Sequence, residues 1–193
     1  MRTLLNFSGG IDSTYCLYHH LKDNPKETLL VHHLNLMNRE GRAPYEKQAV
    51  TNIFNWCIRN GMGNFKYIES TFDYGTLGYL VKDLEVIGFL TGVILRHPGH
   101  QKITDVILPM HKSEMARFPG DSYQRAHHKR KVLAETVAMR EVNFTFPIID
   151  MTKKQIIEGL PEELFKMTWY CRRPRKGEPC GKCHTCLQVK EAL

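Results

Sequence analysis

The sequence predicts an α/β fold, a doubly wound and mostly parallel sheet followed by a small cysteine-rich appendage. Apolar runs typical of strands alternate with helical stretches along the 193 residues. The first apolar run leads directly into the turn Ser8-Gly9-Gly10, and four of the six cysteines lie close together near the C-terminus. The length suits one α/β domain with a short extension. We place the domain at residues 1–160 and the appendage at residues 161–193.

The first half of the chain predicts two strand–helix units and a third strand. Buried strands are expected where Leu, Val, Ile and Phe gather in short runs, and helices where apolar residues recur at helical spacing. The expected elements are, in order, a strand at Leu4–Phe7, a helix at Asp12–Lys22, a strand at Thr28–Leu34, a helix at Tyr45–Asn60 that ends at Gly61, and a strand at Phe65–Glu69.

The second half continues the alternation. A long apolar helix is expected to end at His97-Pro98-Gly99, and Thr152 is expected to cap a short helix before the appendage. The remaining elements are a helix at Leu77–Leu95, a strand at Ile103–Leu108, a helix at Asp121–Arg140 and a strand at Val142–Phe146.

The turn after the first strand, Ser8–Thr14, has the composition of an anion-binding loop. A strand, a glycine turn and a helix start leave backbone N–H groups free to hold phosphate. Gly9 and Gly10 allow a sharp turn and a close approach of the backbone to an anion. Ser8, Ser13 and Thr14 add hydroxyl donors, and Asp12 offers a carboxylate to Mg²⁺. The lysine of a Walker loop is missing.

Ligands of open α/β sheets bind at the carboxyl ends of the strands. Besides Ser8–Ser13, this edge is expected to hold Asn35–Asn38, Ser70–Asp73 and Met110–Glu114, so that His111, Lys112 and Glu114 are placed for function or form a solvated turn. His32 and His33 alternate in one strand, and therefore at most one of them should face the site.

Cys171, Cys180, Cys183 and Cys186 follow the spacing C-x8-C-x2-C-x2-C. Four thiolates at this density suit a closed tetrahedral Zn²⁺ site, which leaves no open position for catalysis. The alternative is a set of disulfides, which needs an oxidising compartment. The N-terminal residues lack the apolar core of a signal peptide and no run is long enough to span a membrane, so a cytoplasmic location is expected. Two further cysteines, Cys16 and Cys57, are expected to be buried in helices.

The chain is basic, with 27 Lys and Arg against 20 Asp and Glu and a formal net charge of +7. Much of the excess lies in two clusters, residues 127–131 and residues 172–182. Such clusters fit a nucleic acid, an anionic substrate such as ATP, or a solvated face.

Both ends of the chain resemble one enzyme family. The segment Ser8-Gly9-Gly10-Ile11-Asp12-Ser13 is similar to the pyrophosphate loop of the ATP pyrophosphatases, Ser-Gly-Gly-x-Asp-Ser. Within that group the chain resembles the 7-cyano-7-deazaguanine synthase family. The segments that carry the resemblance are Phe7–Thr14, Phe146–Lys153, Thr168–Cys171 and the run from Cys171 to Cys186.

The resemblance implies an adenine nucleotide alpha hydrolase-like fold and an ATP-dependent carbon–nitrogen ligase. ATP would adenylate the carboxylate of 7-carboxy-7-deazaguanine, ammonia would displace AMP to give the amide, and a second activation would give the nitrile. It implies ATP and Mg²⁺ at Ser8–Thr14, with Asp12 and Ser13 in catalytic roles, and Zn²⁺ on the four cysteines. A homodimer is compatible with the resemblance, and whether the product is amide or nitrile stays open.

The resemblance is weak in the middle of the chain. The family's Asp-Cys-Arg-Pro segment, which is linked to the base-like substrate, is present only as Asp121-Ser122-Tyr123-Gln124-Arg125. Asp121 is therefore the candidate substrate-binding residue, because a carboxylate accepts two hydrogen bonds from the amino and ring N–H edge of a guanine-like base. The alternative is that Asp121 only caps the helix that follows it.

Two other functions compete with the ligase. A related pyrophosphate-loop enzyme could modify nucleic acid, for example by tRNA thiolation; the basic appendage favours this, whereas no further cysteine near the strand edge is available to carry sulfur. A zinc-containing nucleic-acid binder without enzymatic activity leaves the Ser8–Thr14 loop unexplained. The sequence therefore favours the small-molecule ligase.

Overall fold

The structure, a computed structural model, describes residues 1–77, 83–111 and 123–193. Its centre is a five-stranded sheet in the order β3-β2-β1-β4-β5, in which each neighbouring pair is parallel. The strands are β1 (Thr3–Asn6), β2 (Leu29–Met37), β3 (Phe65–Asp73), β4 (Asp105–Ile107) and β5 (Asn143–Thr145). In the centre of the sheet Leu5 pairs with Val31 on β2 and with Ile107 on β4.

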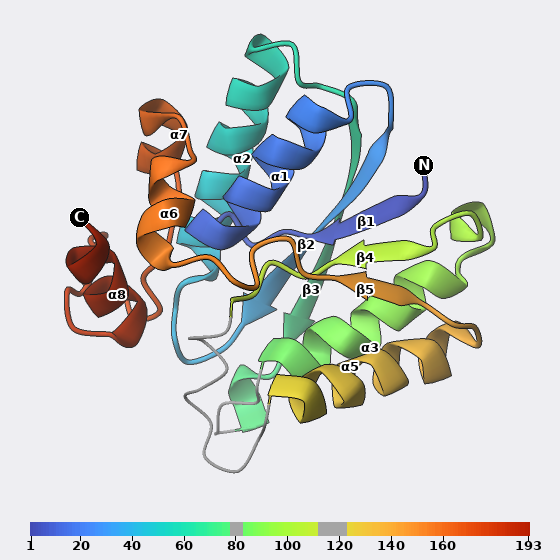
Figure 1. The fold of residues 1–193 in the computed structure, drawn as a ribbon. Coiled ribbons are helices and arrows are strands. Elements are labelled where there is room, and N and C mark those ends of the chain that lie inside the picture. Colours follow the sequence, from blue (N-terminus) through green and yellow to red (C-terminus); the bar gives the residue numbers. More distant parts are fainter. Residues whose placement is uncertain (78–82, 112–122) are drawn as a thin grey trace.

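Helices cover both faces of this sheet (Figure 1). The helices α1 (Ile11–Asp23) and α2 (Ala43–Arg59) lie on one face, and α3 (Asp83–Arg96) and α5 (Tyr123–Ala138) lie together on the other. The other helices of the described residues are α6 (Lys153–Glu158), α7 (Glu162–Lys166), α8 (His184–Ala192) and the short 3-10 turns η1 (Gly75–Leu77) and η2 (Pro98–His100). The predicted doubly wound parallel fold is confirmed.

Strand alternation builds two hydrophobic cores. Leu5 and Val31 point toward α1 and α2, whereas their neighbours Leu4 and Leu30 point toward α3 and α5. All four side chains are at most 1% exposed. Strands buried on both faces need continuous apolar runs, which is why the sequence marked β1 and β2 so clearly.

The pair α3 and α5 packs closely because Gly88 and Gly92 of α3 both lie against α5. A Cβ atom on Gly92 would lie only 2.6 Å from the carbonyl oxygen of Ala134 and 2.6 Å from Cβ of Val137. Glycine at this position therefore allows the two helices to approach each other, and any larger residue would push them apart.

The C-terminal segment packs onto the α1 side of the sheet. Leu164 of α7 and Val189 of α8 are buried in the same core as Leu5, at 0% and 3% exposure. Thr152 caps α6 as expected and forms a reciprocal capping box with Gln155. The division at residue 160 stays a prediction. None of the helices in the described ranges has the length and hydrophobicity needed to cross a bilayer.

The strand order fixes where a ligand can bind. Reading outward from β1, the chain continues to β2 and β3 on one side and to β4 and β5 on the other. The succession of strands therefore changes direction between β1 and β4, and such a switch point opens a crevice at the carboxyl ends of these strands. The Ser8–Thr14 loop follows β1 and therefore lies at this crevice.

Candidate functional site

The loop after β1 has a backbone shape that only glycine accommodates. Gly9 has φ +74°, in the left-handed region. A Cβ atom on Gly9 would also lie 3.0 Å from the carbonyl oxygen of Glu46 and 3.1 Å from a methyl group of Val50. The loop therefore rests directly on α2, with no space for a side chain between them.

The start of α1 presents backbone donors to the pocket. Its N-cap, Gly10, offers no side-chain cap, so the first N–H groups of the helix have no partner within it. The hydroxyls of Ser13 and Thr14 bond the loop itself, with both reaching the carbonyl oxygen of Gly10 at 3.1 Å and 2.8 Å. Ser13 also lies 3.1 Å from the hydroxyl of Ser8. In this structure the two hydroxyls hold the loop in shape, and their contact with phosphate stays a prediction.

Asp12 is paired with a lysine that the sequence analysis gave no role. The Lys153 ammonium donates to both carboxylate oxygens of Asp12, at 2.6 Å and 2.7 Å. Lys153 is the first residue of α6, so the capping box at Thr152 fixes its position. The signal was present in the Thr152-Lys153 end of the segment that carries the family resemblance. The ammonium of Lys153 in α6 thus brings a positive charge to the loop, although no Walker lysine follows the glycines.

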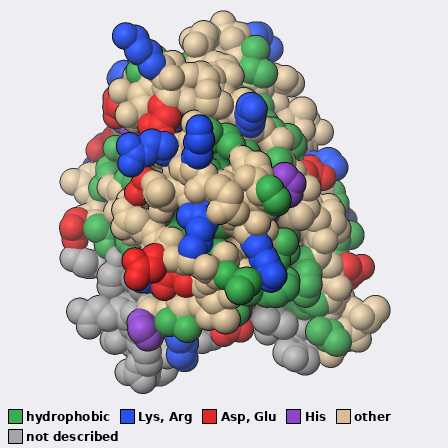
Figure 2. All heavy atoms as spheres, turned by 90° about the vertical axis from the view of Figure 1, so that its right-hand side faces the viewer, with side chains coloured by type: hydrophobic (Ala, Val, Ile, Leu, Met, Phe, Trp, Pro, Cys, Tyr) green, Lys and Arg blue, Asp and Glu red, His purple; other side chains and the backbone are tan. Residues whose placement is uncertain are grey.

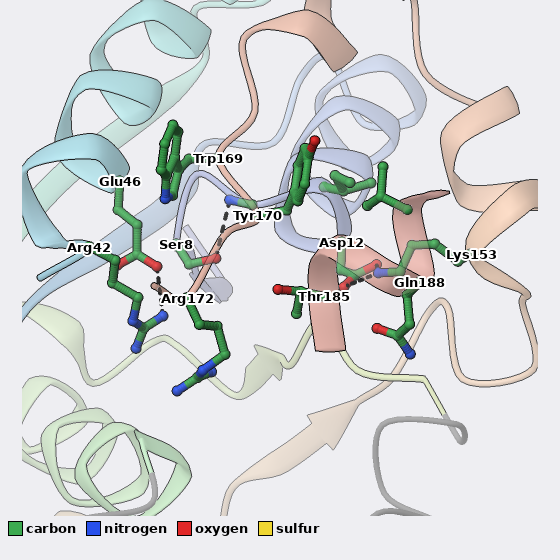
Figure 3. A pocket seen from close by; sticks show the side chains of 13 residues that line it. Ser8, Asp12, Arg42, Glu46, Lys153, Trp169, Tyr170, Arg172, Thr185 and Gln188 are labelled. Atoms are coloured by element: carbon green, nitrogen blue, oxygen red, sulfur yellow. Dashed lines mark hydrogen bonds and ion pairs between the residues drawn. The ribbon is translucent and has the colours of Figure 1, made fainter. Parts of the chain in front are cut away.

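The pocket around this pair is built from five parts of the chain (Figure 3). Besides Asp12 and Lys153 of α6 it is lined by residues of the loop, of α2 and its N-cap, of the segment around Cys171 and of α8; these are Ser8, Gly10, Ile11, Arg42, Glu46, Trp169, Tyr170, Arg172, Thr185, Gln188 and Val189. The backbone N–H of Trp169 donates to the carbonyl oxygen of Gly9 at 2.9 Å. The C-terminal segment is therefore joined directly to the loop.

Two arginines at the pocket are held by carboxylates. Arg42 pairs with Glu40, Glu46 and Asp83 at 2.8, 2.7 and 2.6 Å. Arg172 pairs with Glu40 and Asp83, each at 2.9 Å. Burial raises the pKa of the Glu46 carboxyl, although Arg42 opposes this shift. Because both guanidinium groups are already paired, they hold the pocket walls together rather than offering free charge to a phosphate.

The histidines of β2 are both in the interior. His32 is 2% exposed and its Nε2 lies 2.6 Å from the Ser70 hydroxyl, and His33 is 0% exposed with Nδ1 3.0 Å from the carbonyl oxygen of Phe7. Burial and the neighbouring His33 lower the pKa of His32 to about 4. His111, which follows β4, is 1% exposed, and burial lowers its pKa as well. Lys112, Glu114 and Asp121 lie outside the described residues.

The four cysteines near the C-terminus converge as predicted. Their Sγ atoms all lie within 4.8 Å of one another, and all six cysteines of the chain are free thiols. Zn–S bonds of about 2.3 Å imply about 3.8 Å between the sulfurs of a tetrahedral site. The observed 4.0 Å from Cys180 to Cys186 and 3.4 Å from Cys183 to Cys186 fit a single ion.

Backbone groups support the thiolate form of these cysteines. The N–H of Cys180 donates to Sγ of Cys171 at 3.2 Å, and the N–H of Cys183 donates to Sγ of Cys180 at 3.3 Å. Burial opposes ionisation of Cys183, but hydrogen bonds, led by that of Thr185, lower the pKa of its thiol to about 6. The other two, Cys16 and Cys57, are buried at 3% and 0% exposure, and burial raises the pKa of both thiols.

The two basic clusters differ in structure. In the first, His128 and Lys129 are exposed, whereas Arg130 is buried beside Met110. In the second, Arg175 pairs with Glu178 through backbone bonds in a tight turn. Three cations between the first two cysteines are exposed in and just before this turn, namely Arg173, Arg175 and Lys176. On the opposite side of the molecule from α8, Lys and Arg side chains lie scattered among acidic and hydrophobic ones (Figure 2).

The family described as queuosine biosynthesis protein QueC matches residues 89–193, more than half of the chain. The chain belongs to the QueC family. The matched part contains Lys153, Trp169 and the four cysteines, whereas the Ser8–Thr14 loop lies before it. Membership in QueC supports the predicted class, an ATP-using enzyme with a pyrophosphate loop. None of the curated protein sequences compared with the chain matches it.

Solved structures show the same fold in a distant enzyme. The U34-tRNA thiolase NcsA from Methanococcus maripaludis, solved with its [4Fe-4S] cluster, aligns with this QueC-family chain at a TM-score of 0.59 and 14% identity. The alignment covers 100% of this chain and 63% of the thiolase, so the chain spans less than two thirds of that protein. An Aureusimine biosynthetic cluster reductase domain aligns at a TM-score of 0.38 and 12% identity, over 75% of this chain and 47% of that one, which is too low to support an argument.

Proposed function

We propose that this QueC-family chain is an ATP-dependent ligase that converts 7-carboxy-7-deazaguanine and ammonia into the amide or the nitrile. The observation that carries the proposal is the Asp12–Lys153 pair at the Ser8–Thr14 loop, in a chain whose C-terminal half belongs to the QueC family. The loop supplies N–H donors and the pair supplies a cation and a carboxylate, which is what a nucleotide with a leaving pyrophosphate requires.

The chemistry proceeds in two displacements. The substrate carboxylate attacks the α-phosphorus of ATP, the bond to the bridging oxygen breaks, and pyrophosphate leaves. Ammonia then attacks the carbonyl carbon of the acyl adenylate, loses a proton, and AMP leaves to give the amide. A nitrile requires a second ATP, which activates the amide oxygen so that the oxygen departs with AMP.

The residues of the loop act mainly by position and charge. In this proposal the N–H groups at the start of α1 and the Lys153 ammonium stabilise the negative charge that grows on pyrophosphate, and this role is supported by their position at the border of the same pocket. Asp12 orients Lys153 and offers carboxylate oxygens to Mg²⁺, which would share them with the ammonium. Mg²⁺ neutralises phosphate charge when bound.

The four cysteines fit Zn²⁺ in a structural role. Four sulfurs around one ion leave no open coordination position, so the site holds the C-terminal segment rather than activating water. A four-iron cluster would place its own irons and sulfides between the thiolates, farther apart than the 3.4 Å and 4.0 Å seen here. Zinc is therefore the metal we propose.

Mass spectrometry of the products tests the function. The wild-type protein with 7-carboxy-7-deazaguanine, ammonia, ATP and Mg²⁺ should release AMP and pyrophosphate together with the amide or the nitrile. One AMP per product identifies the amide and two identify the nitrile. Release of ADP and phosphate alone would contradict the proposal.

Asp121→Ala should weaken binding of the heterocycle and leave ATP binding intact. A lower melting temperature with unchanged affinity for the heterocycle would make Asp121 a helix cap.

A second candidate is the modification of a nucleic acid. The exposed cations Arg173, Arg175 and Lys176 favour it, since a basic projection beside an ATP pocket suits a phosphate backbone. The same fold also occurs in a tRNA thiolase. This candidate predicts salt-dependent binding of a tRNA transcript and its adenylation with ATP. Turnover of the free heterocycle without any RNA would favour the ligase instead.

A further inference from the structure

An aromatic wall borders the pocket and takes no part in the phosphate chemistry above. The Trp169 ring stacks on Tyr45, with 4.6 Å between the ring centroids and 17° between the planes. Tyr45 is the third residue of α2 and covers one face of the indole. Trp169 is nevertheless only half-buried and lines the pocket. Part of the indole surface therefore remains exposed in the pocket.

The indole is held rigidly. Its Nε1–H donates to the carbonyl oxygen of Cys171 at 2.8 Å, so the ring is anchored to the cysteine site. Its backbone N–H donates to Gly9 at 2.9 Å, so the residue is also anchored to the loop. A ring fixed at both ends and backed by Tyr45 loses little conformational entropy when a ligand stacks on it.

The rings of Trp169 and Tyr170 stand on either side of the space above Ser8 (Figure 3). Both residues line the pocket. Flat heterocycles bind such aromatic faces by offset stacking, and the interaction does not depend on a particular hydrogen-bond pattern.

We propose that Trp169, backed by Tyr45, is the stacking surface for the heterocycle of the carboxylate substrate. The assignment rests on the proposed function. We assign the stacking surface to the substrate rather than to adenine because the two rings lie at different distances from the α-phosphorus. The reacting carboxylate is attached directly to the deazaguanine ring, which must therefore lie beside the α-phosphorus. Adenine is separated from that phosphorus by a ribose, whereas Trp169 contacts the phosphate loop itself through Gly9.

Calorimetry on two variants tests the assignment. We expect Trp169→Ala to bind 7-carboxy-7-deazaguanine at least about tenfold more weakly than the wild type, as loss of a stacking ring does elsewhere. Affinity for an ATP analogue that cannot be cleaved between the α- and β-phosphates should stay within about twofold. Trp169→Phe keeps a ring and should recover most of the affinity, which a purely structural role of the indole would not predict.

Fluorescence gives an independent measurement, because the chain has only two tryptophans. Trp56 is 8% exposed and its Nε1–H donates to Glu163 at 2.9 Å, away from the pocket residues. In Trp56→Phe the emission comes from Trp169 alone, and the heterocycle should quench it whereas the ATP analogue should not.

The possible failures are distinguishable. Equal affinity of the wild type and Trp169→Ala for the heterocycle would overturn the assignment and leave the proposed function standing. Quenching by the ATP analogue but not by the heterocycle would make Trp169 an adenine platform and also overturn it. Absence of heterocycle binding to the wild type, with or without the analogue, would overturn both the assignment and the proposed function.

Discussion

Replacing Gly9 with alanine tests the shape of the loop, because the chain contains a matched control. Gly9 and Gly61 have the same φ, +74°. A Cβ atom at Gly61 would meet nothing within 4 Å, whereas at Gly9 it would lie 3.0 Å from the backbone of Glu46, 3.1 Å from Val50 and 3.2 Å from Ala49. The two variants therefore share the backbone penalty and differ only in packing.

The expected losses of folding free energy follow from the backbone penalty and the packing contacts. A left-handed backbone costs an alanine about 1–2 kcal/mol of folding free energy. Overpacking against atoms that cannot move away costs about 1–3 kcal/mol more. Gly61→Ala should therefore lose about 1–2 kcal/mol and Gly9→Ala about 2–5 kcal/mol.

Thermal unfolding of both variants measures the difference in stability, and nucleotide titration measures its functional effect. The extra loss at Gly9 should appear as a melting temperature lower by roughly 2–4 °C per kcal/mol. ATP affinity should fall in Gly9→Ala, since the shifted loop misdirects the N–H groups of α1, and should persist in Gly61→Ala. Equal destabilisation of the two variants would refute the packing argument.

Three further changes test the site and the core. Lys153→Met leaves Asp12 without its ammonium and should slow pyrophosphate release about 10²-fold, with partial recovery in Lys153→Arg; unchanged release would remove Lys153 from the mechanism. Cys183→Ser should lose one zinc per chain by elemental analysis and loosen the C-terminal segment, since such sites contribute on the order of 10 kcal/mol; a wild type purified with iron and sulfide instead would contradict the zinc assignment. His32 has a pKa lowered from 6.5 to about 4 by burial and His33, so the unfolded chain takes up the proton first as pH falls. His32 should therefore contribute about 2 kcal/mol to the drop in unfolding free energy from pH 7 to pH 5, and a drop of the same size in His32→Asn would place its origin elsewhere.

Much of the architecture followed from local signals. The strands β1 and β2 contain the buried apolar runs Leu4-Leu5 and Leu29-Leu30-Val31, which are easily recognised and whose side chains alternate between the two covered faces of the sheet. The turn at Gly9 was marked by glycines that the backbone requires. The convergence of the four cysteines followed from their close spacing, which restricts how far apart their sulfurs can lie.

The rest depends on contacts between distant parts of the chain. Lys153 reaches Asp12 only because the strand order brings α6 beside α1, and no local pattern reports that order. The ion pairs of Arg42 with Asp83 and of Arg172 with Glu40 join three separate segments for the same reason. The helices α7 and α8 were not foreseen because helices of five and nine residues owe their stability to tertiary packing.

The bond between Trp169 and Gly9 also sets an order of events during synthesis. The ribosome makes the loop first and the residue that completes it, Trp169, much later. At about 5–20 residues per second, the gap is on the order of ten to thirty seconds. In the first part of that time β1 lacks its partner β4, and until its end the loop lacks the backbone N–H of Trp169. A nascent or truncated chain therefore should not capture nucleotide before residues 153–169 have emerged, which makes nucleotide binding depend on the synthesis of that segment.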